Sequence, residues 1–277
     1  MIGQEKLRAQ LKFASLHGFP RFTIICGGRG GGKRLLSAYI AELLQAQMVW
    51  CSPKVEDVRN VIQLAYQQSQ PTLYVLPDAD KMSLAAKNAL LKITEDSPRK
   101  SYFVMTLQDS ENTLPTLLSR AFVCNLNPYS PQEIIEYAQK SGYQLTPQEI
   151  EVVSNICSLP GDVDLAVRYS ILDFYAYVEK VVDNILEVSG VNAMKIGSKL
   201  YYKEGDSGWD ITLFFRTVML VLGNRMKEKP SMMYVKQIVV TGHYANQMNI
   251  TGINKASTVD MWVLAMREPE RIYDEIL

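Results

Sequence analysis

One glycine-rich segment carries the residue types best suited to chemistry in this sequence. It lies between an apolar run and a helical pattern, and it reads Gly27-Gly28-Arg29-Gly30-Gly31-Gly32-Lys33-Arg34, which matches G-x-x-x-x-G-K. Glycines let backbone N–H groups turn toward phosphate oxygens, while the lysine and the helix N-terminus add positive charge. The segment therefore predicts a nucleotide-binding phosphate loop, with candidate residues Gly27, Gly30, Gly31, Gly32, Lys33 and Arg34.

The motif departs from its pattern at the last position. Arg34 stands where a Ser or Thr hydroxyl would bind Mg²⁺, and a guanidinium cannot ligate a cation. This loop is a degenerate Walker A motif, so we expect ATP or ADP, if bound here, not to undergo Mg²⁺-dependent hydrolysis. We predict no certain cofactor and no metal site.

A later acidic segment shows a second departure. Counting back from the helical landmark at residues 88–92 puts Pro77 at the metal-binding acid of a Walker B motif and Asp78 at its catalytic glutamate. Proline offers no ligand, and Asp78 has no metal beside it. We therefore favour a solvated strand end or a helix cap for Asp78 and Asp80.

The elements that must position these residues alternate in the first part of the chain. Short apolar runs alternate with helical patterns, which predicts a parallel sheet covered on both faces. The expected strands are residues 22–26, 48–51, 72–76, 102–106 and 121–124. The expected helix faces are Leu35, Ala38, Tyr39 and Leu43; Val55, Val58, Ile62 and Ala65; and Ala86, Ala89, Leu90 and Ile93.

The pattern becomes wholly helical after Asn127. Ser130–Glu133 and Thr146–Glu149 are capping boxes with proline at the first helical position, and a third helix start is expected at Gly161-Asp162. Further on, one apolar stripe begins at Phe174, a loop spans residues 205–208, and a second stripe runs from Trp209 through Met226. The expected domains are 1–128, 129–172 and 173–277.

Composition excludes several classes of protein. The 277 residues are 47% hydrophobic and carry 29 basic and 29 acidic side chains, which argues against a stand-alone nucleic-acid-binding domain. The two histidines have no Cys or acid at ligand spacing, and the four cysteines form no CxxC pair, so we expect buried free thiols in a reducing cytosol. No leader or long apolar stretch is evident, which favours a cytoplasmic protein without membrane contact.

Several motifs in order resemble one family. Residues 1–6 resemble the segment of clamp loaders that lies beside the adenine. Residues 55–59 resemble their segment ahead of the third strand. Residues 80–82 and 88–98 resemble their signature helix and its exit. Leu117-Leu118-Ser119-Arg120 resembles the Ser-Arg-Cys motif, with Ala121 replacing the cysteine. The chain thus resembles AAA+ clamp loaders, and most of all the delta-prime subunit of bacterial DNA polymerase III.

The resemblance implies a fold and roles for residues. The fold would be an AAA+ P-loop parallel five-stranded sheet with helices on both faces, then a three-helix lid and an all-α, collar-like C-terminal domain. Arg120, with Ser119 shaping its turn, would be an arginine finger reaching a neighbour's ATP site; the alternative is a surface arginine that offsets a helix dipole. The other implied positions are Gly3 and Gln4 beside the adenine, Gln108 as a sensor, and Asp164 where active subunits carry a lid arginine.

The function implied is that of a non-hydrolysing clamp-loader subunit in DNA replication. Its partners would be clamp-loader ATPase subunits and a clamp-opening subunit in a hetero-oligomer, with the sliding clamp and primer-template DNA reached through the assembly. The zinc module usual between the first two strands is missing. Two alternatives stay open: a self-sufficient AAA+ ATPase motor with a variant P-loop, and a nucleotide-gated interaction module outside replication.

Overall fold

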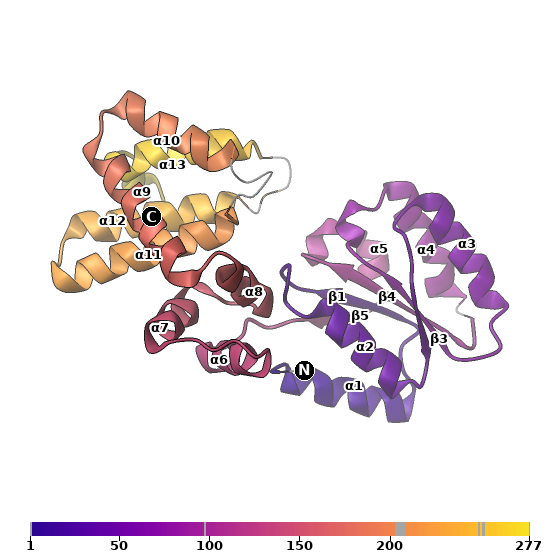
Figure 1. Ribbon diagram of the computed structural model, residues 1–277. Coiled ribbons are helices and arrows are strands. Elements are labelled where there is room, and N and C mark those ends of the chain that lie inside the picture. Colours follow the sequence, from indigo (N-terminus) through magenta and orange to yellow (C-terminus); the bar gives the residue numbers. More distant parts are fainter. Residues whose placement is uncertain (1, 97, 203–208, 249, 251–252, 277) are drawn as a thin grey trace. The chain divides into compact units, whose positions relative to one another are not determined.

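The computed structural model describes residues 2–96, 98–202, 209–248, 250 and 253–276. The chain forms two compact units, Met1–Tyr129 and Ser130–Leu277, which follow each other along the colour bar of Figure 1. The first contains the sheet, and the second is helical.

The sheet of the first unit is parallel throughout. Its strand order is β2-β3-β4-β1-β5. The strands are β1 Phe22–Cys26, β2 Gln47–Trp50, β3 Thr72–Leu76, β4 Ser101–Leu107 and β5 Phe122–Asn125. All five predicted strands are present, with ends shifted by a residue in three of them. Since parallel strands end at one edge, the segments that follow β1, β3 and β4 lie together, as ligand sites of such sheets do.

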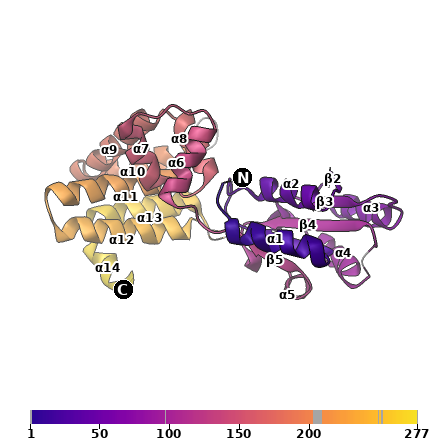
Figure 2. The same ribbon diagram turned by 90° about the horizontal axis from the view of Figure 1, so that it is seen from below.

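Two apolar clusters fill the space between this sheet and its helices. The helical elements of the unit are α1 Glu5–His17, α2 Lys33–Leu43, α3 Val55–Tyr66, η1 Ala79–Lys81, α4 Leu84–Glu95, η2 Ser110–Asn112 and α5 Pro115–Leu118. Ile25 of β1 packs with side chains of α1 and α2 on one face, while its neighbour Ile24 packs with α3 and α4 on the other. Figure 2 shows the sheet between these helices. The alternation of side chains along β1 thus builds both halves of the core.

The buried face of α2 differs from the prediction. Leu36 and Ile40 are fully buried against the sheet, whereas Leu35 is 58% exposed. Both sets of apolar residues have helical spacing, so periodicity alone could not choose between them. Ser37 can share the buried face because its hydroxyl donates to the carbonyl oxygen of Lys33 at 3.0 Å.

The second unit begins with three short helices. They are α6 Pro131–Lys140, α7 Pro147–Ile156 and α8 Pro160–Arg168. Both predicted capping boxes are present, at Ser130 with Glu133 and at Thr146 with Glu149. The third helix starts one residue before the predicted Gly161, and the Asp162 carboxylate accepts the N–H groups of two residues ahead of it at 3.0 Å.

Six further helices follow in the described part of this unit. They are α9 Ile171–Glu187, α10 Gly190–Tyr202, α11 Ile211–Glu228, α12 Met232–Gln247, α13 Lys255–Arg267 and α14 Glu270–Ile276. The predicted stripe of α9 is buried from Phe174 to Ile185. The second stripe was placed too early, because Trp209 precedes α11 and packs its ring 4.8 Å from that of Phe174. The predicted loop at 205–208 lies outside the described residues.

Among the described residues, no helix combines the length and the apolar character that crossing a membrane requires.

Candidate functional site

The glycine-rich loop lies between β1 and α2, as the sequence predicts. The N–H of Gly27 donates to the carbonyl oxygen of Leu107, the last residue of β4, at 3.1 Å. A Cβ at Gly27 would lie 2.9 Å from the Cβ of Leu126, so only glycine fits this exit from the sheet. Gly30 and Gly32 have φ of 80° and 93°, which side chains rarely tolerate. The glycines thus meet local geometric demands as well as leaving room for a ligand.

Lys33 turns back onto the loop. Its ammonium donates to the carbonyl oxygens of Gly27 at 2.5 Å and Gly28 at 2.9 Å. Burial lowers the pKa of this ammonium, and the nearby charges of Asp80 and Asp78 oppose that shift. The backbone of the loop therefore holds the Lys33 ammonium in place.

The Arg34 side chain extends to edge strand β2. Its guanidinium lies over the ring of Trp50, 5.6 Å from the ring centroid, at the end of edge strand β2. Such a cation–π contact gives the side chain a structural partner on the surface. Within the described residues, no group of three or more His, Cys, Asp or Glu side chains could hold a metal ion.

The exits of β3 and β4 are tied to each other. Asp78, which follows Pro77, has a left-handed backbone, and its N–H donates to the Thr106 hydroxyl at 3.1 Å. Asp78 is the N-cap residue of η1 through its carbonyl oxygen, which accepts the Lys81 N–H at 3.0 Å, while its exposed carboxylate lies 3.8 Å from the Lys81 ammonium. Gln108 takes part through its backbone, since its N–H donates to both carboxylate oxygens of Asp80 at 3.0 Å.

Asp80 is the acid that sequence reasoning undervalued. Its charge acts on Lys33 more strongly than that of Asp78, although the register pointed to Asp78. The sequence contains both acids, Asp78 and Asp80, in one short segment. Only the structure, in which η1 follows Asp78, shows that Asp80 has the larger effect on Lys33 of the glycine-rich loop.

Gly3 and Gln4 directly precede α1. The Gln4 side-chain amide donates to the Asn127 carbonyl oxygen at 2.7 Å and accepts the Asn127 N–H at 3.0 Å. Gln4 is 8% exposed and, like Gly3, has a positive φ. Both hydrogen-bonding ends of Gln4 are thus engaged by the chain itself.

Arg120 and Ser119 lie at the opposite edge of the sheet from the loop. They precede β5, whose Phe122 pairs with Thr23 near the start of β1, whereas the loop follows the end of β1. A five-residue strand separates these two edges by about 16 Å. Arg120 therefore does not join the loop of its own chain.

The Arg120 side chain is exposed and lightly held. Its Nη1 donates to the Thr116 carbonyl oxygen at 3.1 Å, and its Nη2 lies 3.5 Å from Oε1 of Glu95 at the end of α4. The Ser119 hydroxyl donates to the same carbonyl oxygen at 3.1 Å. The Arg120 side chain is 41% exposed.

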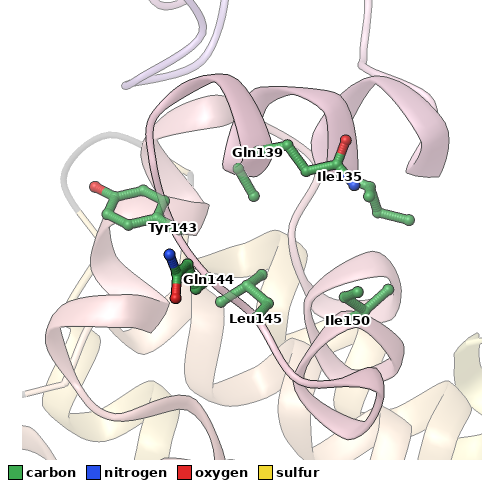
Figure 3. A pocket seen from close by; sticks show the side chains of 7 residues that line it. Ile135, Gln139, Tyr143, Gln144, Leu145 and Ile150 are labelled. Atoms are coloured by element: carbon green, nitrogen blue, oxygen red, sulfur yellow. The ribbon is translucent and has the colours of Figure 1, made fainter.

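The Asp164 carboxylate is hydrogen-bonded to two tyrosines within the three-helix segment α6–α8. The hydroxyls of Tyr137 and Tyr143 donate to its carboxylate at 3.0–3.1 Å. Tyr143 also borders a hollow of about 200 Å³ between α6 and α7, shown in Figure 3. The other lining residues are Ile135, Ala138, Gln139, Gln144, Leu145 and Ile150. Their uncharged side chains assign no chemistry to the hollow.

Comparison with known proteins agrees with this fold. A solved chain of the RuvB Holliday junction branch migration motor of Thermotoga maritima aligns with a TM-score of 0.50 and 18% identity, over 67% of this chain and 76% of that one. A DNA polymerase III gamma subunit-related protein of the same organism aligns with a TM-score of 0.51 and 15% identity, over 95% and 99%. The fold is thus that of AAA+ P-loop proteins, with an all-helical C-terminal region.

Sequence comparisons point to a more specific group of proteins than the fold does. Residues 26–130 match the family model described as DNA polymerase III, delta subunit. DNA polymerase III subunit delta' of Yersinia pestis is 41% identical over 71 residues, which are 24% of this chain and 21% of that protein. The sheet unit is therefore similar to the delta-prime subunits of clamp loaders. The alignment thus spans about a fifth of that relative.

Proposed function

We propose that the chain acts as a non-hydrolysing clamp-loader subunit in DNA replication and donates Arg120 to the ATP site of a neighbouring subunit. The observation that carries this proposal is the position of Arg120, which is exposed and lies at the edge of the sheet opposite to its own loop, with the length of β1, about 16 Å, between the two edges. A forked guanidinium there can stabilise the charge that develops on a transferred phosphoryl group of another chain.

Three features support the absence of hydrolysis by the chain itself. Arg34 replaces the hydroxyl that binds Mg²⁺ and lies over Trp50. Pro77 offers no ligand at the metal-binding position. Asp78, at the position of the catalytic acid, has its carboxylate beside Lys81. Each departure affects the same reaction, so their combination disfavours a self-sufficient motor.

The assembly that follows from this proposal is a hetero-oligomer in the cytoplasm. Clamp-loader ATPase subunits and a clamp-opening subunit would be the direct partners, and the sliding clamp and primer-template DNA would be reached through them. Within the helical unit, we propose that residues up to 172 act as the lid and the rest as a collar-like domain.

The test is a reconstitution with the clamp-loader ATPase and clamp-opening subunits encoded in the same genome. Arg120→Ala should lower phosphate release at the dependent ATP site by about 10³ or more, because a finger contributes factors of that size. Arg120→Lys should restore only part of it, since an ammonium lacks the fork. Assembly on size-exclusion chromatography should be unchanged.

The matched control is Arg271→Ala. Arg271 is also an exposed arginine with a carboxylate partner, Glu268 at 2.6 Å. Equal turnover for Arg120→Ala and the control would contradict the finger role. Steady phosphate release by the isolated natural chain with ATP and Mg²⁺ would contradict the non-hydrolysing role and favour the motor.

A further inference from the structure

Tyr129 packs against the middle of the glycine-rich loop. It is 8% exposed, and its hydroxyl donates to the Gly31 carbonyl oxygen at 3.2 Å. The same hydroxyl oxygen lies 3.2 Å from the place that a Cβ at Gly32 would take. The absence of a side chain at position 32 therefore lets the tyrosine approach the loop closely.

The loop also satisfies groups that would otherwise face a phosphate. Lys33 donates to the carbonyl oxygens of Gly27 and Gly28, and the N–H of Gly31 donates to Gly28 at 3.1 Å. In a phosphate loop, the lysine and such N–H groups are the donors that contact the ligand. Nucleotide binding would have to replace these internal bonds.

The position of Tyr129 is itself fixed within the sheet unit. Two residues earlier, Asn127 is held by both ends of the Gln4 amide. One segment after β5 is thus tied first to the N-terminal segment and then to the loop. By resemblance, those are the base side and the phosphate side of a nucleotide site.

We propose that Tyr129 excludes nucleotide from this loop and supplies the order that a bound nucleotide would otherwise give. The inference rests on the non-hydrolysing part of the proposed function and deepens it: such a subunit would keep an ordered loop without nucleotide while its partners hydrolyse ATP. The apparent affinity for nucleotide is reduced by the small fraction of molecules in which the tyrosine has left the loop.

The test is calorimetric titration of the isolated chain with ADP, without Mg²⁺, for the natural protein, Tyr129→Ala and Tyr129→Phe. The natural protein should show no binding in the concentration range tested. Tyr129→Ala should bind at least about ten-fold more tightly, since the competing side chain is gone. Tyr143→Phe is the control, because it removes a tyrosine hydroxyl that is bonded to Asp164 within the helical unit.

Tyr129→Phe keeps the ring, so it remains informative if the alanine variant fails to fold. Amide hydrogen exchange of residues 28–33 should become roughly five-fold faster in Tyr129→Phe, as expected for the loss of one neutral hydrogen bond, and stay unchanged in Tyr143→Phe. Unchanged exchange in Tyr129→Phe would overturn the proposal.

Equal ADP affinity of the natural protein and a folded Tyr129→Ala variant would overturn it too, as would ADP binding by neither. None of these outcomes affects the finger role of Arg120, which is measured by phosphate release in the assembled complex. Failure of the further inference and failure of the proposed function are therefore distinguishable.

Discussion

Gln4 offers a direct test of how the N-terminal segment is held. Its side-chain amide pairs with the Asn127 backbone through two bonds, of 2.7 Å and 3.0 Å, and the residue is 8% exposed. Gln4→Ala removes both bonds and leaves two Asn127 groups without their partner. Gln10, exposed on α1, the helix that follows Gln4, provides the matched control Gln10→Ala.

The expected loss of folding free energy in Gln4→Ala follows from these two hydrogen bonds and their surroundings. Each neutral hydrogen bond contributes about 1 kcal/mol net, and a backbone group left without a partner in the interior costs more. Asn127 is exposed, so water can satisfy its released N–H and C=O groups. We therefore expect a loss of about 1–2 kcal/mol, or roughly 4–8 °C in Tm for a unit of this size.

The isosteric variant Gln4→Glu sharpens the test. At neutral pH a carboxylate would face the Asn127 carbonyl oxygen in place of the donating amide, so this repulsion raises the carboxyl pKa in the folded state. Because the folded pKa lies above the unfolded one, stability relative to the natural protein should be recovered as pH falls and lost as pH rises through the folded pKa. The alanine variant should show no such pH dependence.

Thermal unfolding followed by circular dichroism, from pH 4 to pH 8, measures both effects. A Gln4→Ala variant as stable as Gln10→Ala would refute the reasoning, since the amide pair would then contribute nothing. A Gln4→Glu variant whose deficit is the same at every pH would show that the carbonyl contact is not maintained.

Asp162 caps α8 and lies 2.6 Å from the Arg216 guanidinium, so Asp162→Ala should destabilise the helical unit by about 2–4 kcal/mol in urea unfolding. An Asp162→Asn variant as stable as the natural chain would contradict the charge contribution. Hydrogen bonds from the Thr146 N–H and hydroxyl lower the pKa of Glu149. The stability that the Glu149 carboxylate gives the fold is therefore present above its unfolded pKa and lost as pH falls through its folded pKa. An acid titration should show this loss in the natural chain and not in Glu149→Gln. Burial raises the pKa of every cysteine thiol, to about 11 for Cys26, so a disulfide reagent should react only on unfolding, and fast labelling of the native chain would contradict the burial. The cysteines concerned are Cys26, Cys51, Cys124 and Cys157.

Local patterns predicted most of the secondary structure correctly. The strands from β1 to β5 are short apolar runs, and the boxes at Ser130 and Thr146 are local hydrogen-bond patterns that need no distant partner. The prediction was wrong where two readings had the same period, as at Leu35 and Leu36 in α2. Which set faces the sheet depends on where the loop starts the helix, and this is a tertiary property.

Site residues divide in the same way. The degeneracy at Arg34 and Pro77 needs only residue type and register, because neither side chain can bind Mg²⁺ in any conformation. The roles of Gln4 and Tyr129 could not be predicted, since their partners lie 123 and 98 residues away along the chain. No spacing rule connects side chains at such separations.

Residue type and spacing alone predict a phosphate-type loop without a Mg²⁺ ligand, because glycine, lysine, arginine and proline bring their chemistry with them. Tertiary structure decided which groups meet: it gives Lys33 the loop's own carbonyl oxygens, brings Tyr129 onto Gly31, and places Arg120 at the opposite edge of the sheet. The physical reason is that hydrogen bonds depend on distance and direction, and only the register of parallel strands fixes these between distant segments.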